Sequence, residues 1–314
     1  MIDFLQRTLD GLLEAGPYAL VGLGLTLGFG VLKRVNLAYG AGAMAAAYLG
    51  AWLHARHGLP LLPVLLVVIA GTALAGLYVE WICFAPQDDA SARRGVALPG
   101  ADGREVVALA ASFALWMQLE QLAVGLLPRH LNPFPTLAVT REWTLGPLGL
   151  RPDRLLLLVL AVALVLAVSQ ALRRSWGGLA WRAVSDQRTA AQLVGLDVSR
   201  LQRWSFVATC ALAGLAAAAV LTLEGQVTPM FGMWMLVKGL VAAMLGGLGS
   251  VRGVLIGAVV LGVVEAHAQA AFGALGRDAT AWLLLLAVLV WRSWRSARNF
   301  SLPTGAAPAG YGHA

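Results

Sequence analysis

Long apolar stretches recur along nearly the whole chain and constrain its fold more than any other feature. A helix rises about 1.5 Å per residue, so about 20 apolar residues cross the roughly 30 Å hydrocarbon core of a bilayer. Backbone groups in lipid must be satisfied within the segment, which restricts such spans to helices. The nine candidate spans are residues 15–32, 36–53, 60–84, 105–127, 153–171, 204–223, 233–249, 252–272 and 279–292.

We therefore predict an all-α fold, a polytopic transmembrane helical bundle. The second, seventh and ninth stretches are short or broken by glycine, so eight or nine spans are expected, some of them broken or re-entrant. Pairs of small residues four apart, such as Gly24–Gly28 and Gly253–Gly257, favour close helix packing. Residues 1–300 are expected to form one transmembrane domain, and residues 301–314 a flexible tail.

Composition supports the membrane assignment. The 314 residues are 59% hydrophobic and 12% charged, against about 25% charged in soluble domains. The two cysteines, Cys83 and Cys210, lie in apolar stretches and suggest neither a disulfide framework nor a metal site. The N-terminus lacks a basic region before its apolar stretch, so no cleavable signal peptide is predicted.

The distribution of basic residues predicts an orientation. With the N-terminus outside and all nine stretches crossing, 15 of the 23 Lys and Arg lie inside and 8 outside. Cytoplasmic loops are enriched in basic residues, so this bias places the C-terminus in the cytoplasm and explains the net charge of +7 without nucleic acid. The predicted inner residues are Lys33, Arg34, Arg93, Arg94, Arg104, Arg173, Arg174, Arg182, Arg188, Arg200, Arg203, Arg252, Arg292, Arg295 and Arg298.

Three polar segments separate the spans. Residues 85–104 are predicted to form a cytoplasmic loop, and residues 128–152, with five prolines, an irregular outer loop. The third segment, residues 172–203, has helical periodicity between Gly178 and Gly195, and Gly195 is placed to end that helix in a left-handed conformation. Too short and too charged to span, this helix suits either an interfacial anchor or docking on a soluble partner.

Two places interrupt the helical pattern. Residues 33–42 put two cations and Asn36 between apolar stretches, and residues 245–253 put four glycines, Ser250 and Arg252 between two more. Ordinary cytoplasmic turns would explain both. Discontinuous helices whose ends face a substrate path would explain them equally well.

Charged residues within spans are functional candidates because each costs about 2.5–3.5 kcal/mol at mid-bilayer. Here they are Glu80, Glu120, Glu224, Glu265 and Lys238, too scattered to establish a proton relay. The chain has no GxxxxGK[ST] loop, no catalytic arrangement and no metal-ligand spacing. We expect no enzymatic activity and no cofactor, so any ATP must be bound and hydrolysed by a partner.

An ordered set of motifs resembles the permeases of branched-chain amino acid ABC importers. Tyr18-Ala19-Leu20 and the stretch NLAYG match the opening of that family. GLAWRAVSDQRTAAQLVGL matches its cytoplasmic segment, and KGLVAAMLGGLGSVRGV, followed by Glu265, matches a later glycine-rich run. The similarity extends from about residue 15 to 292, with three departures. The family's His-Gly-Glu is Tyr39-Gly40-Ala41 here, its usual ending, Pro-x-Gly followed by Leu or Phe, is replaced by WRSWRSARNF, and the outer loop at 128–152 is rich in proline.

The resemblance implies roles for particular residues. In such importers the cytoplasmic segment, here within 172–203, docks on the ATPase, which favours docking over an anchor. The implied coupling residues are Gly178, Arg182, Ala183, Asp186, Ala190 and Gly195. The implied substrate path passes Asn36, Tyr39, Gly40, Gly246, Gly247, Gly249, Ser250 and Glu265.

The resemblance also implies an assembly in the bacterial inner membrane. This pore subunit would pair with a homologous permease, two cytoplasmic ATPases and a periplasmic binding protein. Branched-chain or related amino acids, or small amides such as urea, would be the substrates. The alternatives are a sugar or nucleoside permease of the same superfamily, and a secondary transporter or channel that works alone.

Overall fold

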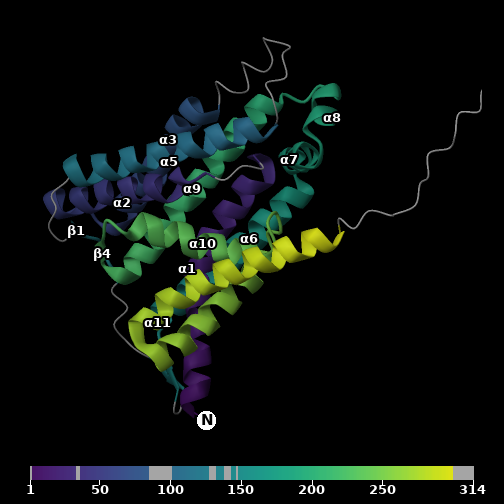
Figure 1. Cartoon of the computed structure of the whole chain (residues 1–314). Helices are drawn as coiled ribbons and strands as arrows, with labels where there is room; N and C mark the ends of the chain where they lie inside the picture. Colours follow the sequence, from purple (N-terminus) through teal and green to yellow (C-terminus); the bar gives the residue numbers. More distant parts are fainter. Residues whose placement is uncertain are drawn as a thin grey trace, which may run out of the picture.

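A computed structural model describes residues 2–32, 36–84, 101–126, 132–137, 143–145 and 148–299 (Figure 1). Helices make up nearly all of it. They are α1 (Ile2–Leu32), α2 (Ala38–His57), α3 (Leu61–Val79) continued by the π-helix η1 (Glu80–Phe84), α5 (Ala101–Leu126), α6 (Pro152–Arg174), α7 (Trp176–Asp186), α8 (Arg188–Leu193), α9 (Val198–Glu224), α10 (Phe231–Gly246) and α11 (Gly253–Asn299).

The helical membrane fold is confirmed, and each of the nine predicted stretches lies largely in helix. Six helical segments in the described residues are long and apolar enough to cross a membrane. Nine predicted stretches become six segments in three ways. The 16-residue α10 and the helix α2 are not among the six, and the last two predicted stretches both lie almost entirely in α11, which counts once. α11 nevertheless consists of two helices, since Gly273 interrupts it with φ 74° and ψ −162°. The six segments are Ile2–Gly30, Leu61–Cys83, Val106–Gly125, Pro152–Arg174, Val198–Glu224 and Gly253–Trp294.

Helix α1 is the central element of the bundle. It packs against α6, α9, α10 and α11, while α3 packs on α9 and α2 lies between α3 and α5. In its most apolar stretch 78% of the residues are buried, against 22% in α5 and α6. α5 and α6 therefore lie at the periphery, with most of their apolar side chains exposed for lipid or another subunit.

Small residues allow the helix backbones to touch. A Cβ added at Gly40 of α2 would lie 2.1 Å from the carbonyl oxygen of Gly232 in α10, closer than any side chain could be accommodated. A Cβ at Gly257 of α11 would lie 2.1 Å from the carbonyl oxygen of Ala242 in α10. Both crossings are the backbone contacts that small-residue pairs permit between membrane helices.

Four short strands mark one end of the bundle. β1 (Asn132–Pro133) pairs antiparallel with β4 (Gln226–Val227), and β2 (Trp143–Leu145) with β3 (Leu148–Leu150). The segment 128–152, predicted to form an irregular outer loop, thus contains short strands, of which β2 and β3 pair locally and β1 pairs with the distant β4. We call the end of the bundle that carries β1 to β4 the strand end.

The opposite end carries α7, α8 and the turn between α10 and α11, and we call it the α7 end (Figure 1). Here the last turns of α1 meet α7, because a Cβ at Gly30 would lie 2.5 Å from the Trp181 ring. The first turns of α1 lie at the strand end, where the Gln6 side chain bonds both backbone groups of Gly149 at 2.9 and 3.1 Å. The tail 301–314 and most of the 85–104 segment lie outside the described residues.

Candidate functional site

A buried ion pair joins α10 to α11. Lys238 and Glu265 form a direct salt bridge, and their side chains are only 3% and 2% exposed. The Glu265 carboxylate also accepts a hydrogen bond from the Tyr18 hydroxyl at 2.6 Å, and the Arg277 guanidinium lies 3.6 Å from it. Isolated charges at such depth are expensive, and this cluster of partners is what makes the burial of Glu265 tolerable.

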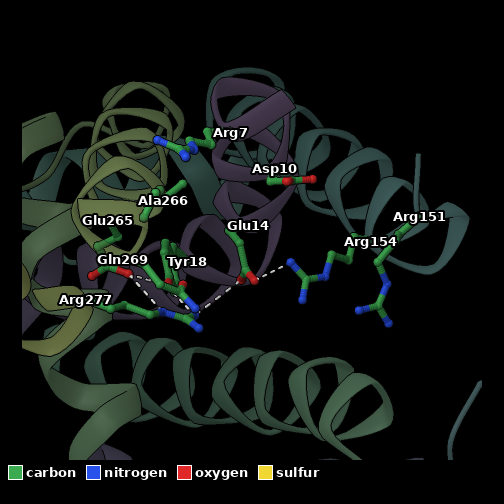
Figure 2. Close-up of a pocket in the computed structure, with 12 residues that line it drawn as sticks. Arg7, Asp10, Glu14, Tyr18, Arg151, Arg154, Glu265, Ala266, Gln269 and Arg277 are labelled. Atoms are coloured by element: carbon green, nitrogen blue, oxygen red, sulfur yellow. Dashed lines mark hydrogen bonds and ion pairs between the residues drawn. The ribbon is translucent and has the colours of Figure 1, made fainter. Parts of the chain in front are cut away.

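The network continues across α1 to α6. Arg277 donates to the Tyr18 hydroxyl at 2.9 Å and lies 3.6 Å from the carboxylate of Glu14. Glu14 in turn forms a 2.6 Å ion pair with Arg154 at the start of α6 (Figure 2). Four helices, α1, α6, α10 and α11, are thus connected by one chain of charges.

All of these residues except Lys238 line a cavity of about 390 Å³ at the strand end, which we call the charged pocket (Figure 2). One wall is a stripe of α1, because Arg7, Asp10, Glu14 and Tyr18 follow one another at helical spacings of 3, 4 and 4. Helices α6 and α11 supply the other walls. The remaining lining residues are Arg151, Arg154, Gly262, Glu265, Ala266, Gln269, Ala270 and Arg277.

The substrate-path residues predicted in the first interruption lie elsewhere. Asn36 is buried and accepts a hydrogen bond from the Ala38 amide at 3.0 Å, at the first residue of α2. Tyr39 donates to the Val21 carbonyl at 3.2 Å. Both border a cavity of only about 20 Å³, room for about one water molecule. Gly40 lies at the crossing of α2 and α10, so this part of the predicted path is closed by packing.

The second interruption is a tight turn between α10 and α11. Gly247 and Gly249 have φ values of +90° and +89°, a conformation that only glycine adopts at low cost. The Ser250 hydroxyl accepts from the Gly253 amide at 3.1 Å and caps α11. Gly246 and Gly253 touch backbone to backbone. The predicted path residues thus lie in three places: the start of α2, the α10–α11 turn and, for Glu265, the charged pocket. Their joint role in a substrate path stays a prediction.

The segment predicted to couple to an ATPase forms two helices rather than one. The expected continuous helix from Gly178 to Gly195 is wrong, because Gln187 is extended, with φ −141° and ψ 101°, and separates α7 from α8. The apolar spacing of seven residues between Ala183 and Ala190 runs across this break and hides it. Gly195 does end α8 as expected, with φ +89°.

Its side chains divide between an inner and an outer face. Val184 and Ala191 are buried on Val198 of α9, and Gly178 is pressed against the end of α6. Of the predicted coupling residues, Arg182, Ala183, Asp186, Ala190 and Gly195 are exposed. Large apolar side chains are exposed beside them, namely Trp176, Leu179, Leu193 and Val194, at 88%, 52%, 85% and 83%.

A second cavity, of about 830 Å³, lies at the α7 end. Its lining includes Arg182 and Asp186 of α7 together with Gly249 and Ser250 of the α10–α11 turn. Residues predicted separately for coupling and for the substrate path therefore share one cavity.

Of the other charged residues in the spans, Glu224 interacts electrostatically with Arg277 and Glu14 of the network, whereas Glu80 and Glu120 have partners elsewhere. Glu80 pairs with Arg203 at 3.3 Å, and the Trp116 ring nitrogen donates to Glu120 at 2.8 Å. No group of three or more potential metal ligands occurs in the described part of the chain.

Sequence reasoning missed the charged pocket as a unit. It identified Lys238 and Glu265 singly, but the two residues lie 27 positions apart and nothing in the sequence indicates that they pair. The stripe on α1 could be predicted from the sequence by its helical spacing. Its spacing continues the first span toward the N-terminus, although the stripe is too polar to be recognised as part of a span.

The chain is similar to known transport proteins. A family model described as "Branched-chain amino acid transport system / permease component" matches residues 7–291. The high-affinity branched-chain amino acid transport system permease protein BraD of Pseudomonas aeruginosa is 27% identical over 301 residues, covering 92% of this chain and 94% of BraD. LivH of Escherichia coli, with the same description, is 25% identical over 302 residues, covering 91% and 93%.

Two further similarities are weaker. The fructose import permease protein FrcC of Rhizobium meliloti is 31% identical over 97 residues, which cover 29% of this chain and 27% of FrcC. Among solved structures, PsaBC from Streptococcus pneumoniae in complex with Fab matches with a TM-score of 0.46 and 15% identity, covering 91% of this chain and 90% of that one.

Proposed function

This chain belongs to the branched-chain amino acid transport permease family, and we propose that it is the pore subunit of an ATP-driven importer in the bacterial inner membrane. The family match extends over residues 7–291, so it includes the bundle, the charged pocket and the α7–α8 segment. A permease of such a system moves its substrate and depends on other subunits for energy.

The proposed assembly has a second, homologous permease, two cytoplasmic ATPases and a periplasmic binding protein. Exposed apolar surface supports a protein partner at the α7 end, because Trp176, Leu193 and Val194 project from two short helices that also carry charges. A short helix that presents apolar anchors with charges beside them suits docking in a groove of a soluble protein. The binding of ATP would then take place on the partner, with no cofactor in this chain.

We further propose how movement of α7 reaches the membrane helices. Trp181 of α7 fits against Gly30 near the end of α1, and α1 packs on four other helices. Displacement of α7 by a closing ATPase would therefore push on the central helix of the bundle. The cavity shared by Arg182, Asp186 and the α10–α11 turn provides a second route to α11.

Branched-chain or related amino acids are the proposed substrates, and small amides such as urea the next class. BraD and LivH, which match over most of their length, support the amino acids. The short match to a fructose permease supports the alternative of a sugar permease. The single observation that carries the proposed function is the family match over nearly the whole chain.

The coupling role is tested by Arg182→Ala and Asp186→Ala in the complete transporter. We expect a large loss of substrate uptake per ATP hydrolysed, because these side chains lie on the exposed face of α7, with the membrane bundle still folded. Arg200→Gln is the matched control, since Arg200 is 77% exposed at the start of α9 and lies off that face. Wild-type uptake by both α7 variants would refute the coupling assignment.

A stand-alone transporter is the competing class. Copurification of the native complex separates the two, because an importer subunit brings stoichiometric ATPase subunits with it, and a stand-alone carrier brings none.

A further inference from the structure

Basic residues that break the predicted orientation bias gather at one site. Arg7, Arg151, Arg154 and Arg277 line the charged pocket, and Lys238 lies behind it on Glu265. These are five of the eight Lys and Arg that the sequence places outside. Charges within membrane segments are costly, so a site where several of them cluster is a candidate functional site.

The inner part of the charged pocket has an excess of positive charge. At distances up to 3.6 Å, three cations, Lys238, Arg277 and Arg154, share two carboxylates, Glu265 and Glu14, while the more distant Glu224 also acts on Arg277. Asp278 lies 4.0 Å from Lys238, but its side chain is 71% exposed and its charge is screened by water. One additional carboxylate in the pocket would balance the charges, and Arg154 and Arg277 carry the forked donors that bind carboxylates best.

A carboxylate without a cationic partner lies close by. Asp10 is one helical turn from Glu14 and extends toward α6 (Figure 2). It accepts one hydrogen bond, from Gln6 at 3.0 Å, and no cation lies within 4.0 Å of it among the described side chains. An ammonium group bound at the Asp10 carboxylate would lie in the same pocket as the arginines but would pair with an acidic side chain.

Part of the α11 wall is small and apolar, because beside Glu265, Gln269 and Arg277 the pocket is lined by Gly262, Ala266 and Ala270 of the same helix. Their short side chains leave room for an aliphatic group. A volume of about 390 Å³ lies within the roughly 300–1,000 Å³ of small-molecule sites.

We propose that the charged pocket binds a free zwitterionic amino acid, with its carboxylate at Arg154 and Arg277, its ammonium at Asp10 and its side chain against Ala266. This inference rests on the proposed function and narrows it, because a neutral sugar or urea has no charges to match these groups. In the predicted orientation the strand end faces the periplasm, so the site would receive substrate released by the binding protein.

The first experiment measures equilibrium binding of radiolabelled L-leucine to the full chain, purified with its complex in nanodiscs. Competitors are 4-methylpentanoate, which lacks the ammonium, 3-methylbutylamine, which lacks the carboxylate, and fructose. We expect each singly charged analogue to compete at least tenfold less well than leucine, and fructose not to compete.

The second experiment repeats the measurement on variants. Asp10→Asn and Arg154→Gln are each expected to weaken leucine binding at least tenfold. Arg174→Gln is the matched control, because Arg174 lies on the same helix as Arg154 but is exposed at the α7 end. A thermal unfolding midpoint for each variant verifies the fold, and Asp10→Asn preserves the shape of a side chain whose one described partner is Gln6.

The outcomes separate the site from the function. Equal affinity in wild type and both variants, or equal competition by the singly charged analogues, overturns the site. Absence of leucine binding in a complex that imports leucine with ATP also overturns the site and leaves the proposed function standing. A complex that imports fructose and not leucine overturns both.

Discussion

At the scale of single residues, the buried Lys238–Glu265 pair makes the stability of the bundle sensitive to substitution of either partner. Each partner is nearly inaccessible, and each compensates the charge of the other. Removing one partner of a buried pair leaves an uncompensated charge, which costs far more than the pair contributes when intact.

We expect Glu265→Leu to lower the free energy of unfolding by about 3–5 kcal/mol, because it leaves Lys238 buried beside the Tyr18 ring. Adding Lys238→Met should recover much of the loss. Asp278→Asn, which changes an exposed carboxylate, should alter stability by less than about 1 kcal/mol. Denaturant unfolding in detergent measures all three. A double variant as unstable as Glu265→Leu alone would contradict this explanation.

At the scale of elements, the crossings between helices depend on backbone contact. We expect Gly40→Ala to destabilise the bundle by about 1–3 kcal/mol, because the added methyl group meets the rigid Gly232 carbonyl at 2.1 Å. Gly125→Ala is the control in another membrane helix, with nothing within 4 Å of the new Cβ. Unfolding measurements in detergent that give equal stabilities for the two variants would show that α2 and α10 do not cross as described.

The elements themselves were largely predictable, because a span needs only length and an apolar composition. Their limits were less so. The first span was expected at residue 15, yet α1 begins at Ile2, since its polar first turns are stabilised by tertiary partners such as Gly149 and Arg154. The break at Gln187 and the β2–β3 pairing were not predictable from periodicity, and the charged pocket requires knowledge of which helices are neighbours.

At the scale of the whole molecule, the predicted orientation, with the N-terminus outside and the C-terminus in the cytoplasm, requires an odd number of membrane crossings. Cys83 and Cys210 are buried and are replaced by Ser to give a background for labelling. In spheroplasts, a membrane-impermeant maleimide should then label Asp3→Cys and leave Ser293→Cys unlabelled. Inverted vesicles should give the opposite result. Labelling of both positions from one side would mean an even number of crossings.

The whole-molecule claim is that this chain carries substrate only when separate subunits supply the energy of ATP. The most direct test is uptake of radiolabelled L-leucine into proteoliposomes that contain the native complex, with its binding protein and with or without ATP. We predict uptake that requires ATP and is absent from vesicles containing this chain alone. Leucine uptake by the chain alone, at the rate of the complete complex and without ATP, would contradict the account.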